Sequence, residues 1–260
     1  MRRLHLFELE DQAWFPRVIR DAGTAYLRKA IEISGQAERL APLLAGALAR
    51  NDSKHLVDLC SGGAGPVPAI VEILAREGIE VTAELTDLYP NVGGLDHASE
   101  GGNGRICWRA EAVDATALPK DARGTRTLFS ALHHFRPKVA RAILVDAMRS
   151  QQPIAAFEVV SRHPLSLLSI VLSPIAVFLL VPLIRPFQTS WLLFTYLIPI
   201  IPIFVVWDGL VSCVRSYSEA ELRELTAGLD EAGYTWEIGR VSLSPAPIDG
   251  TYLLGHPGSG

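Results

Sequence analysis

The segment HLVDLCSGGAG (residues 55–65) joins a short apolar run to a turn of small residues. A run of this length is typical of a buried strand, and the stretch PAIVEILAREG (residues 68–78) that follows has helical periodicity and stops at Gly78. Small residues in such a turn let the backbone approach a ligand at the carboxyl end of the strand, where open α/β sheets bind cofactors. The segment therefore predicts a strand, a ligand-binding turn and a helix in succession.

Strands and helices alternate along the rest of the chain. Apolar runs predict strands at residues 79–87, 106–115, 125–129, 154–161, 235–241 and 250–256, and amphipathic runs predict helices at residues 139–150 and 217–234. Ser218 and Glu221 have the spacing of a capping box for the second of these helices. This order predicts an α/β fold in which a largely parallel sheet is covered by helices on both faces.

Changes in composition divide the chain into four segments. We expect residues 1–50 to form a helical cap, residues 51–164 the main part of the core, residues 165–207 an inserted hydrophobic hairpin, and residues 208–260 the carboxyl-terminal part of the core.

Carboxylates recur at one edge of the predicted sheet. Asp58 lies beside the small-residue turn, Asp87 ends the second strand, and Asp114 lies near the expected end of the third. Taken singly, each has a simpler explanation, because Asp87 could begin a polar loop and Asp114 could cap a helix. Their joint order places all three on the edge where a cofactor binds.

Residues 58–65 resemble motif I of class I S-adenosylmethionine-dependent methyltransferases, D-[LV]-G-x-G-x-G, although Cys60 and Ala64 stand at positions commonly held by glycine. The resemblance implies S-adenosylmethionine as the cofactor and a Rossmann-like, seven-stranded mixed sheet with an antiparallel seventh strand. It extends over residues 55–160 and the closing strands. The residues that it assigns to cofactor binding are Asp58, Cys60, Gly62, Gly63, Asp87, Asp114, Ala115 and Ser130.

The resemblance also implies a role for each carboxylate. Asp58 would face the amino-acid end of the cofactor and Asp87 the ribose hydroxyls, while Asp114 and the amide of Ala115 would read the adenine. A nicotinamide or flavin fingerprint, G-x-G-x-x-G, is disfavoured because residues 60–67 do not have that spacing. No Tyr-x-x-x-Lys pair follows the fourth strand, which disfavours a short-chain oxidoreductase.

Candidate catalytic groups follow the fourth and fifth strands. His133 or His134 could act as a general base, because an imidazole titrates near neutrality, or could simply pack at a strand end. Glu158 is an acid within an apolar strand and needs a partner there. It could be a base, but we expect it to pair with Arg162 or Arg215.

Charge and cysteine content exclude several classes of function. The net charge is −4 and the basic residues are scattered, so we expect no binding to nucleic acid. Cys60, Cys107 and Cys213 are too far apart for a zinc knuckle or a redox pair, which predicts a reducing compartment and no metal site. The first residues lack the apolar core of a signal peptide.

The hydrophobic excess is concentrated in the predicted hairpin. Residues 165–184 and 191–207 carry almost no charge and, as helices, would be about 30 and 25 Å long. Trp191 and Trp207 would suit a membrane interface. The prolines disfavour regular helices that cross the membrane and favour a hairpin that lies in its surface. These prolines are Pro174, Pro182, Pro199 and Pro202.

The hairpin predicts membrane association, with the catalytic domain on the cytoplasmic side. The alternatives are a homodimer interface or an apolar substrate pocket. Since the hairpin follows the fifth strand, near the active edge, we expect a small, apolar or lipid-like acceptor. A membrane-anchored protein that binds the cofactor as a sensor or scaffold, without turnover, is the alternative function.

Overall fold

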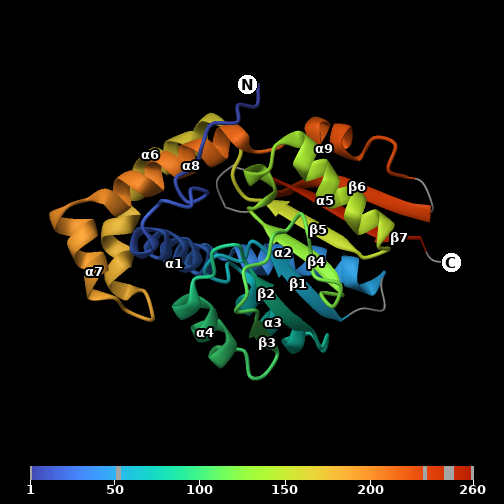
Figure 1. Ribbon diagram of the computed structural model, residues 1–260, viewed down its shortest axis with the longest axis horizontal. Coiled ribbons are helices and arrows are strands. Elements are labelled where there is room, and N and C mark those ends of the chain that lie inside the picture. Colours follow the sequence, from blue (N-terminus) through green and yellow to red (C-terminus); the bar gives the residue numbers. More distant parts are fainter. Residues whose placement is uncertain (1, 51–53, 231–232, 243–248, 259–260) are drawn as a thin grey trace.

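The computed structural model describes residues 2–50, 54–230, 233–242 and 249–258. Its centre is a seven-stranded sheet in the order β3-β2-β1-β4-β5-β7-β6 (Figure 1). Strands β1 to β5 pair in parallel, and β7 pairs antiparallel with β5 and β6, which confirms the predicted mixed sheet. The strands are β1 (His55–Leu59), β2 (Thr82–Thr86), β3 (Ile106–Trp108), β4 (Thr125–Phe129), β5 (Ile154–Glu158), β6 (Tyr234–Ser242) and β7 (Asp249–Pro257).

The path of the chain through the sheet reverses between β1 and β4. From β1 the chain passes through α3 (Val67–Arg76) to β2 and through α4 (Val92–Gly101) to β3, and then returns to β4 on the other side of β1. Connections that leave neighbouring strands in opposite directions open a crevice at the carboxyl ends of those strands. The loops after β1 and β4 therefore bound the place where this fold can hold a ligand.

Helices cover both faces of the sheet. Helix α2 (Gln36–Ala49) packs with α3 and α4 on one face, and α5 (Pro137–Arg149) packs with α9 (Glu219–Thr226) on the other. Leu56 and Val57 belong to the two different cores because successive strand residues point to opposite faces. The predicted capping box is confirmed at the start of α9.

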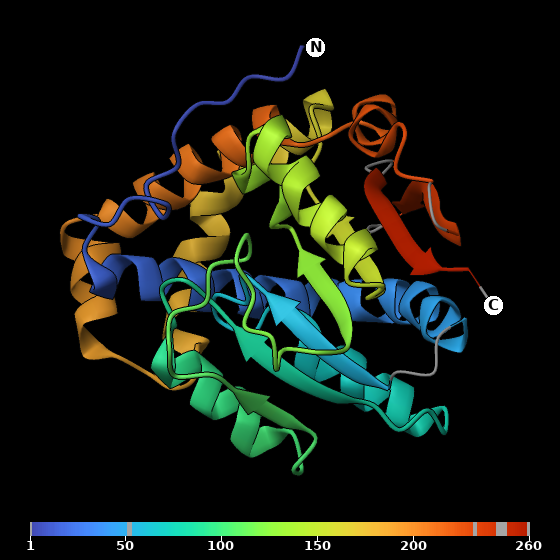
Figure 2. The same ribbon diagram turned by 45° about the vertical axis from the view of Figure 1, so that its right-hand side comes forward.

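A third layer lies beside the sheet and contains the hydrophobic segment. Helices α1 (Arg17–Ser34), α6 (Pro164–Leu180) and α8 (Ile200–Arg215) share a separate apolar core, in which Phe15 and Trp191 are buried. The α6 and α8 pair lies along α1, with the turn between them at the end farthest from the sheet (Figure 2). The hairpin is thus attached to the N-terminal helix as well as to the core.

The hairpin is irregular at its outer end. Helix α6 continues into η2 (Val181–Leu183), and after a loop the chain forms α7 (Thr189–Leu192) and the π-helix η3 (Leu193–Leu197). The segment Thr189–Leu197 is bent by 79° relative to α8, and Pro199 stands at the break. The prediction of a continuous helix over residues 191–207 is therefore wrong. Proline interrupts the helix, which agrees with the expectation that the prolines oppose regular spans.

Two further boundaries differ from the predictions. Helix α8 runs on to Arg215 and so continues past the predicted end of the hairpin at residue 207. Strand β3 ends at Trp108, so Asp114 lies in the following loop and not near the end of that strand. A short 3-10 helix, η1 (Leu132–His134), follows β4 and presents the two histidines.

Candidate functional site

Hydrogen bonds to strand β2 hold the turn after β1 in place. The backbone N–H of Gly62 donates to Oδ2 of Asp87 at 2.7 Å, and the N–H of Ser61 donates to the carbonyl of Thr86 at 3.0 Å. The other oxygen of Asp87 accepts from the N–H of Tyr89 at 2.7 Å. Asp87 thus fixes both the turn and the start of its own loop.

Asp58 lies beneath this turn and is almost fully buried. Its carboxylate oxygens accept hydrogen bonds from the hydroxyls of Ser61 and Thr127, each at 2.6 Å. Burial raises the pKa of Asp58 to about 7, although these two hydrogen bonds favour the ionised form. The side chain ties the turn to the neighbouring strand β4, since Asp58 and Thr127 are register partners.

The two residues that replace glycines of motif I adopt the left-handed conformation that glycine favours. The φ angles are +57° at Cys60 and +80° at Ala64, and Gly62 between them has φ +52°. A non-glycine residue in this region is held there against its preference. The turn therefore keeps the backbone shape that the motif requires without glycine at either position.

Burial raises the pKa of the Cys60 thiol, which keeps the thiol protonated and unsuited to be a nucleophile.

A cavity of about 570 Å³ opens at the reversal point of the sheet. One end is formed by the loops after β1 and β4, including Gly62, Gly63 and Ser130. The opposite wall comes from α1, α6 and α8, so the cavity reaches from the glycine turn into the hydrophobic hairpin. Its volume is in the range of small-molecule sites. The residues of these helices that line it include Thr24, Leu27, Ser166, Ser169, Ser173, Phe204, Val205 and Asp208.

Helix α1 packs directly on the glycine turn. A Cβ placed on Gly63 would lie 3.0 Å from the carbonyl oxygen of Thr24, and one on Gly62 would lie 3.3 Å from its methyl group. Asn91 holds the same helix by donating to the Thr24 hydroxyl at 2.8 Å. The small residues of the turn thus serve close packing against α1 as well as access for a ligand.

Glu158 and His133 form a buried pair at the polar end of the cavity. The Nδ1 of His133 lies 2.6 Å from one carboxylate oxygen, and the backbone N–H of His133 donates to the other at 3.1 Å. A carboxylate at this distance makes Nδ1 the donor and turns Nε2 toward Glu8. The expected pairing of Glu158 with an arginine is wrong, because Arg162 pairs with Glu221 and Arg215 with Glu8.

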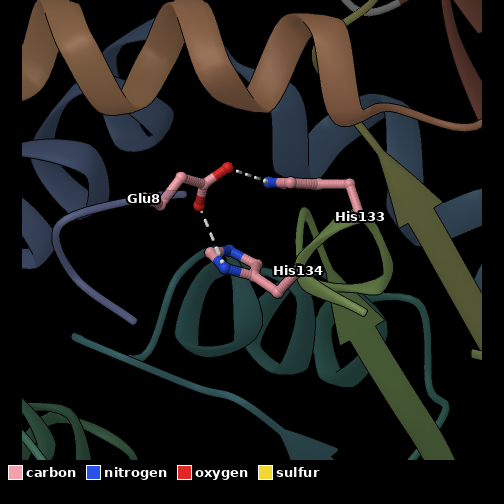
Figure 3. A group of neighbouring side chains, drawn as sticks. All are labelled: Glu8, His133 and His134. Atoms are coloured by element: carbon pink, nitrogen blue, oxygen red, sulfur yellow. Dashed lines mark ion pairs between the residues drawn. The ribbon is translucent and has the colours of Figure 1, made fainter. Parts of the chain in front are cut away.

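The N-terminal segment brings Glu8 between the two histidines (Figure 3). One oxygen of Glu8 lies 3.7 Å from Nε2 of His133, and the other lies 3.0 Å from Nδ1 of His134. Asp11 lies 2.7 Å from the same nitrogen of His134, and Arg215 pairs with both acids at 3.1 and 2.8 Å. Burial opposes a charge on His134, but Glu8 and Asp11 outweigh it and hold the pKa of this imidazole well above its ordinary value.

Asp208 of helix α8 anchors the N-terminal segment. Its carboxylate accepts hydrogen bonds from the backbone N–H groups of Leu9 and Glu10, at 2.8 and 2.9 Å. Arg20 donates to the carbonyls of Glu10 and Gln12 from the other side. These contacts hold Glu8 over the two histidines, so a residue far away in the sequence completes this end of the cavity.

The structure separates the predicted cofactor-binding and catalytic residues into three groups. Cys60, Gly62, Gly63 and Ser130 line the cavity, and so do His133 and His134. Asp58, Asp87 and Glu158 lie behind the wall and hold lining residues in place. Asp114 is exposed and accepts hydrogen bonds from the amide and hydroxyl of Thr116, so it closes a local turn, and Ala115 packs in the core beside α5. The structure brings neither to the cavity.

Glu8, Asp11 and Thr127 complete the site but do not stand out in the sequence, and Arg215, which was considered as a partner of Glu158, contacts Glu8 and Asp11 instead. The first two lie in an acidic leader that has no motif, and Arg215 follows the hydrophobic segment. Their contacts with the histidines join residues more than 80 positions apart. The only signal was a run of acids, Glu8, Glu10 and Asp11, ahead of an apolar helix, which alone indicates no site.

Comparisons with known proteins support the fold and give no sequence family. No protein-family model matches the chain, and no curated protein matches it by sequence. Among solved structures, the plantazolicin methyltransferase BpumL in complex with SAH aligns at 10% identity with a TM-score of 0.52, over 93% of this chain and 96% of that one. Magnesium protoporphyrin IX methyltransferase from Synechocystis PCC 6803, with bound SAH, aligns at 13% identity with a TM-score of 0.50, over 88% and 86%.

An O-methyltransferase family protein from Burkholderia thailandensis gives a TM-score of 0.51 at 13% identity, over 88% of this chain and 58% of that one. At these identities the likeness concerns the fold. The chain has the Rossmann-like fold of class I methyltransferases, as its sequence indicated.

Proposed function

We propose that this chain is an S-adenosylmethionine-dependent methyltransferase whose acceptor is a small amphipathic or lipid-like molecule taken from a membrane surface. One observation carries the proposal: a single cavity joins the glycine turn after β1 to the hydrophobic hairpin and has two histidines at its polar end. A cofactor site, a place for an apolar acceptor and polar groups near the reacting atoms are thereby brought into one space.

The residues at the glycine turn suit the proposed cofactor. Gly62, Gly63 and Ser130 line the cavity at the reversal point of the sheet, and Asp87 fixes the turn through the amide of Gly62. Asp58 lies behind the turn and holds the hydroxyls of Ser61 and Thr127, which fixes the wall of this site. When bound, S-adenosylmethionine would supply a methyl group on a sulfonium centre. The similar structures that contain SAH support this assignment.

The chain itself would position the acceptor and exclude water. The apolar wall formed by α1, α6 and α8 would hold the body of the acceptor, and the corner formed by His133, His134 and Glu8 would receive its polar group. Methyl transfer needs the nucleophile in line with the methyl group, so orientation of the acceptor within the cavity is the main contribution expected from the protein.

An exposed apolar surface supports membrane association. Helix Pro164–Leu183 is long and apolar enough to cross a membrane, and only 17% of it is buried, although a single such helix is also seen in soluble proteins. Monomeric soluble proteins seldom expose a large contiguous apolar surface. We propose that the hairpin lies in the surface of the cytoplasmic leaflet. The exposed side chains include Leu168, Leu172, Ile175, Leu179, Leu197, Ile198 and Ile203.

The proposal is tested in two steps. Calorimetry with S-adenosylmethionine and S-adenosylhomocysteine should give one site per chain for each. The purified protein, incubated with a lipid extract and labelled cofactor, should then transfer label to a molecule whose mass grows by one methylene group. Binding without formation of S-adenosylhomocysteine would favour a sensor or scaffold, and absence of binding would remove the cofactor assignment.

A further inference from the structure

We infer that Glu8, His133 and His134 bind a divalent transition-metal ion at the polar end of the cavity. This inference goes beyond the proposed methyl transfer and does not depend on it. It also departs from the sequence-based expectation of no metal site, which considered only the spacing of the cysteines. Two imidazoles and one carboxylate are the donor set of open zinc and non-haem iron sites.

The donor atoms converge at distances that a small ion can bridge. One ligand atom from each of the three residues lies within 4.8 Å of the other two. Glu8 lies 3.7 Å from Nε2 of His133 and 3.0 Å from Nδ1 of His134. Tetrahedral ligands at zinc distances are separated by about 3.3 Å, so the ligand atoms would draw together from separations of up to 4.8 Å. The ion would also replace the Nδ1 proton that His134 shares with Glu8 and Asp11. Figure 3 shows the Glu8 carboxylate beside the two rings, with one oxygen toward each.

Both histidines have the outer carboxylate that is typical of metal-binding imidazoles. Glu158 accepts the Nδ1 proton of His133 and directs Nε2 toward Glu8. Glu10 lies 3.5 Å from Nε2 of His134, on the side of the ring away from Glu8. Such outer carboxylates fix the tautomer and orientation of the ligating ring. The stacked rings, with centroids 4.4 Å apart, present their inner nitrogens side by side.

An unpartnered buried nitrogen points independently to a ligand. His133 is 2% exposed and its Nε2 has no hydrogen-bond partner among the described residues. Oε1 of Glu8, in a residue with no exposed surface, is the nearest carboxylate oxygen to this nitrogen in the cluster, at 3.7 Å. Buried polar atoms are normally satisfied, and a cation between Nε2 and the Glu8 carboxylate would satisfy the nitrogen. Arg215 lies within ion-pair distance of Glu8. The carboxyl groups of Glu10, Asp11 and Glu158 lie within ion-pair distance of the two histidine rings.

The site would be open on one side. His133 and His134 line the cavity, so a bound ion would have three protein ligands and a free coordination position facing the space that reaches the glycine turn. Three protein ligands with one open position distinguish catalytic from structural zinc sites. If methyl transfer also holds, the open position would lie where the acceptor's polar group is expected.

Metal binding is tested on the full chain without affinity tags. The protein is first stripped of metal with a chelator. Separate samples are then dialysed against Zn²⁺, Co²⁺ or Mg²⁺, and a further sample is dialysed against Fe²⁺ under anaerobic conditions. Elemental analysis should find about one Zn²⁺, Co²⁺ or Fe²⁺ per chain and no retained Mg²⁺, because imidazole favours the transition ions. The Co²⁺ form should absorb in the visible range, and Zn²⁺ should raise the melting temperature.

Variants locate the ion. Glu8→Gln and His134→Gln should abolish stoichiometric binding, and Glu158→Gln should weaken it by about 10- to 100-fold through the orientation of His133. His97→Gln, a change to an exposed histidine on α4, is the matched control and should bind like the unaltered chain. Failure of the unaltered chain to retain any transition ion would overturn the inference and leave an ion-pair cluster. This outcome is independent of cofactor binding, which calorimetry measures separately.

Discussion

The buried carboxylate of Asp58 makes folding depend on pH in a direction opposite to that of most acids. Burial raises its pKa from 3.8 to about 7, so between these values the folded chain retains a proton that the unfolded chain has lost. The free energy of unfolding should therefore fall as pH rises through this window, by up to about 1.4 kcal/mol per pH unit.

Asp58→Asn tests this directly. The amide does not ionise, so the variant should gain stability relative to the unaltered chain as pH rises from 5 to 8. Chemical denaturation at several pH values measures the difference, and other titrating groups cancel because they are common to both chains. Parallel stability curves would show that Asp58 is not protonated in the folded state.

The resemblance gave both Asp87 and Asp114 a direct contact with the cofactor, to the ribose and to the adenine, and the structure distinguishes them. Asp87 fixes the glycine turn through the amide of Gly62, whereas Asp114 closes an exposed turn away from the cavity. Loss of a hydrogen bond to a charged group costs about 1.5–3 kcal/mol, so Asp87→Ala should weaken S-adenosylmethionine binding by on the order of tenfold or more.

Asp114→Ala is the matched control and should change the affinity little. Calorimetric titration of both variants measures the contrast. Equal losses in the two variants would mean that the loop after β3 reaches the cofactor and that Asp114 has the adenine role implied by motif I.

At the scale of elements, the contact between α1 and the glycine turn explains why small residues are needed there. Gly63 does not have a positive φ, yet a Cβ on it would lie 3.0 Å from a backbone oxygen of α1, which cannot move as a side chain can. Gly63→Ala should therefore destabilise the fold by about 1–3 kcal/mol through overpacking.

Gly46→Ala provides the opposite case. A Cβ on Gly46 meets no atom within 4 Å, and the residue lies inside helix α2, where alanine stabilises by up to about 1 kcal/mol. Denaturant unfolding should thus move the two variants in opposite directions. If Gly63→Ala is as stable as the unaltered chain, the glycine turn does not depend on close packing against α1.

For the whole molecule, the sequence predicted the sheet well because strand and helix periodicities are local properties. The resemblance to class I methyltransferases implied the antiparallel seventh strand, whereas the reversal between β1 and β4 was not among the predictions. Local sequence could not predict that β3 would end at Trp108, since charged and apolar residues alternate over residues 109–112 as they can in a strand with one exposed face.

The polar end of the cavity could not be predicted for a different reason. Glu8, His133 and Arg215 come from three distant segments, and only the packing of the N-terminal segment on α8 brings them together. The sequence did identify both histidines and Glu158, because charged groups stand out beside apolar strands. It assigned Glu158 the wrong partner, because the position of an arginine in the sequence does not show which residue Glu158 contacts in the folded chain.

The exposed hairpin gives the last prediction, which concerns the molecule as a whole. Leu179 is 66% exposed on α6 and Leu197 is 76% exposed at the end of η3, so neither contributes much to the folded core. Burial of such side chains in lipid is favourable by about 25 cal/mol per Å² of apolar area, and a charge at the same place opposes insertion. Leu179→Asp and Leu197→Asp together should therefore reduce binding to vesicles of phosphatidylcholine and phosphatidylglycerol by at least about tenfold, as measured by co-sedimentation.

Val139→Asp, on α5 outside the hairpin, is the control and should bind vesicles like the unaltered chain. Sedimentation velocity without lipid separates the alternative that the hairpin joins two copies of the chain. In that case the unaltered protein would sediment as a dimer, the double variant would be monomeric, and neither would bind vesicles. If the protein is a monomer and binds vesicles only when Leu179 and Leu197 are intact, the hairpin lies at the lipid surface. The apolar end of the cavity would then face the lipid, and an amphipathic acceptor could enter between α6 and α8.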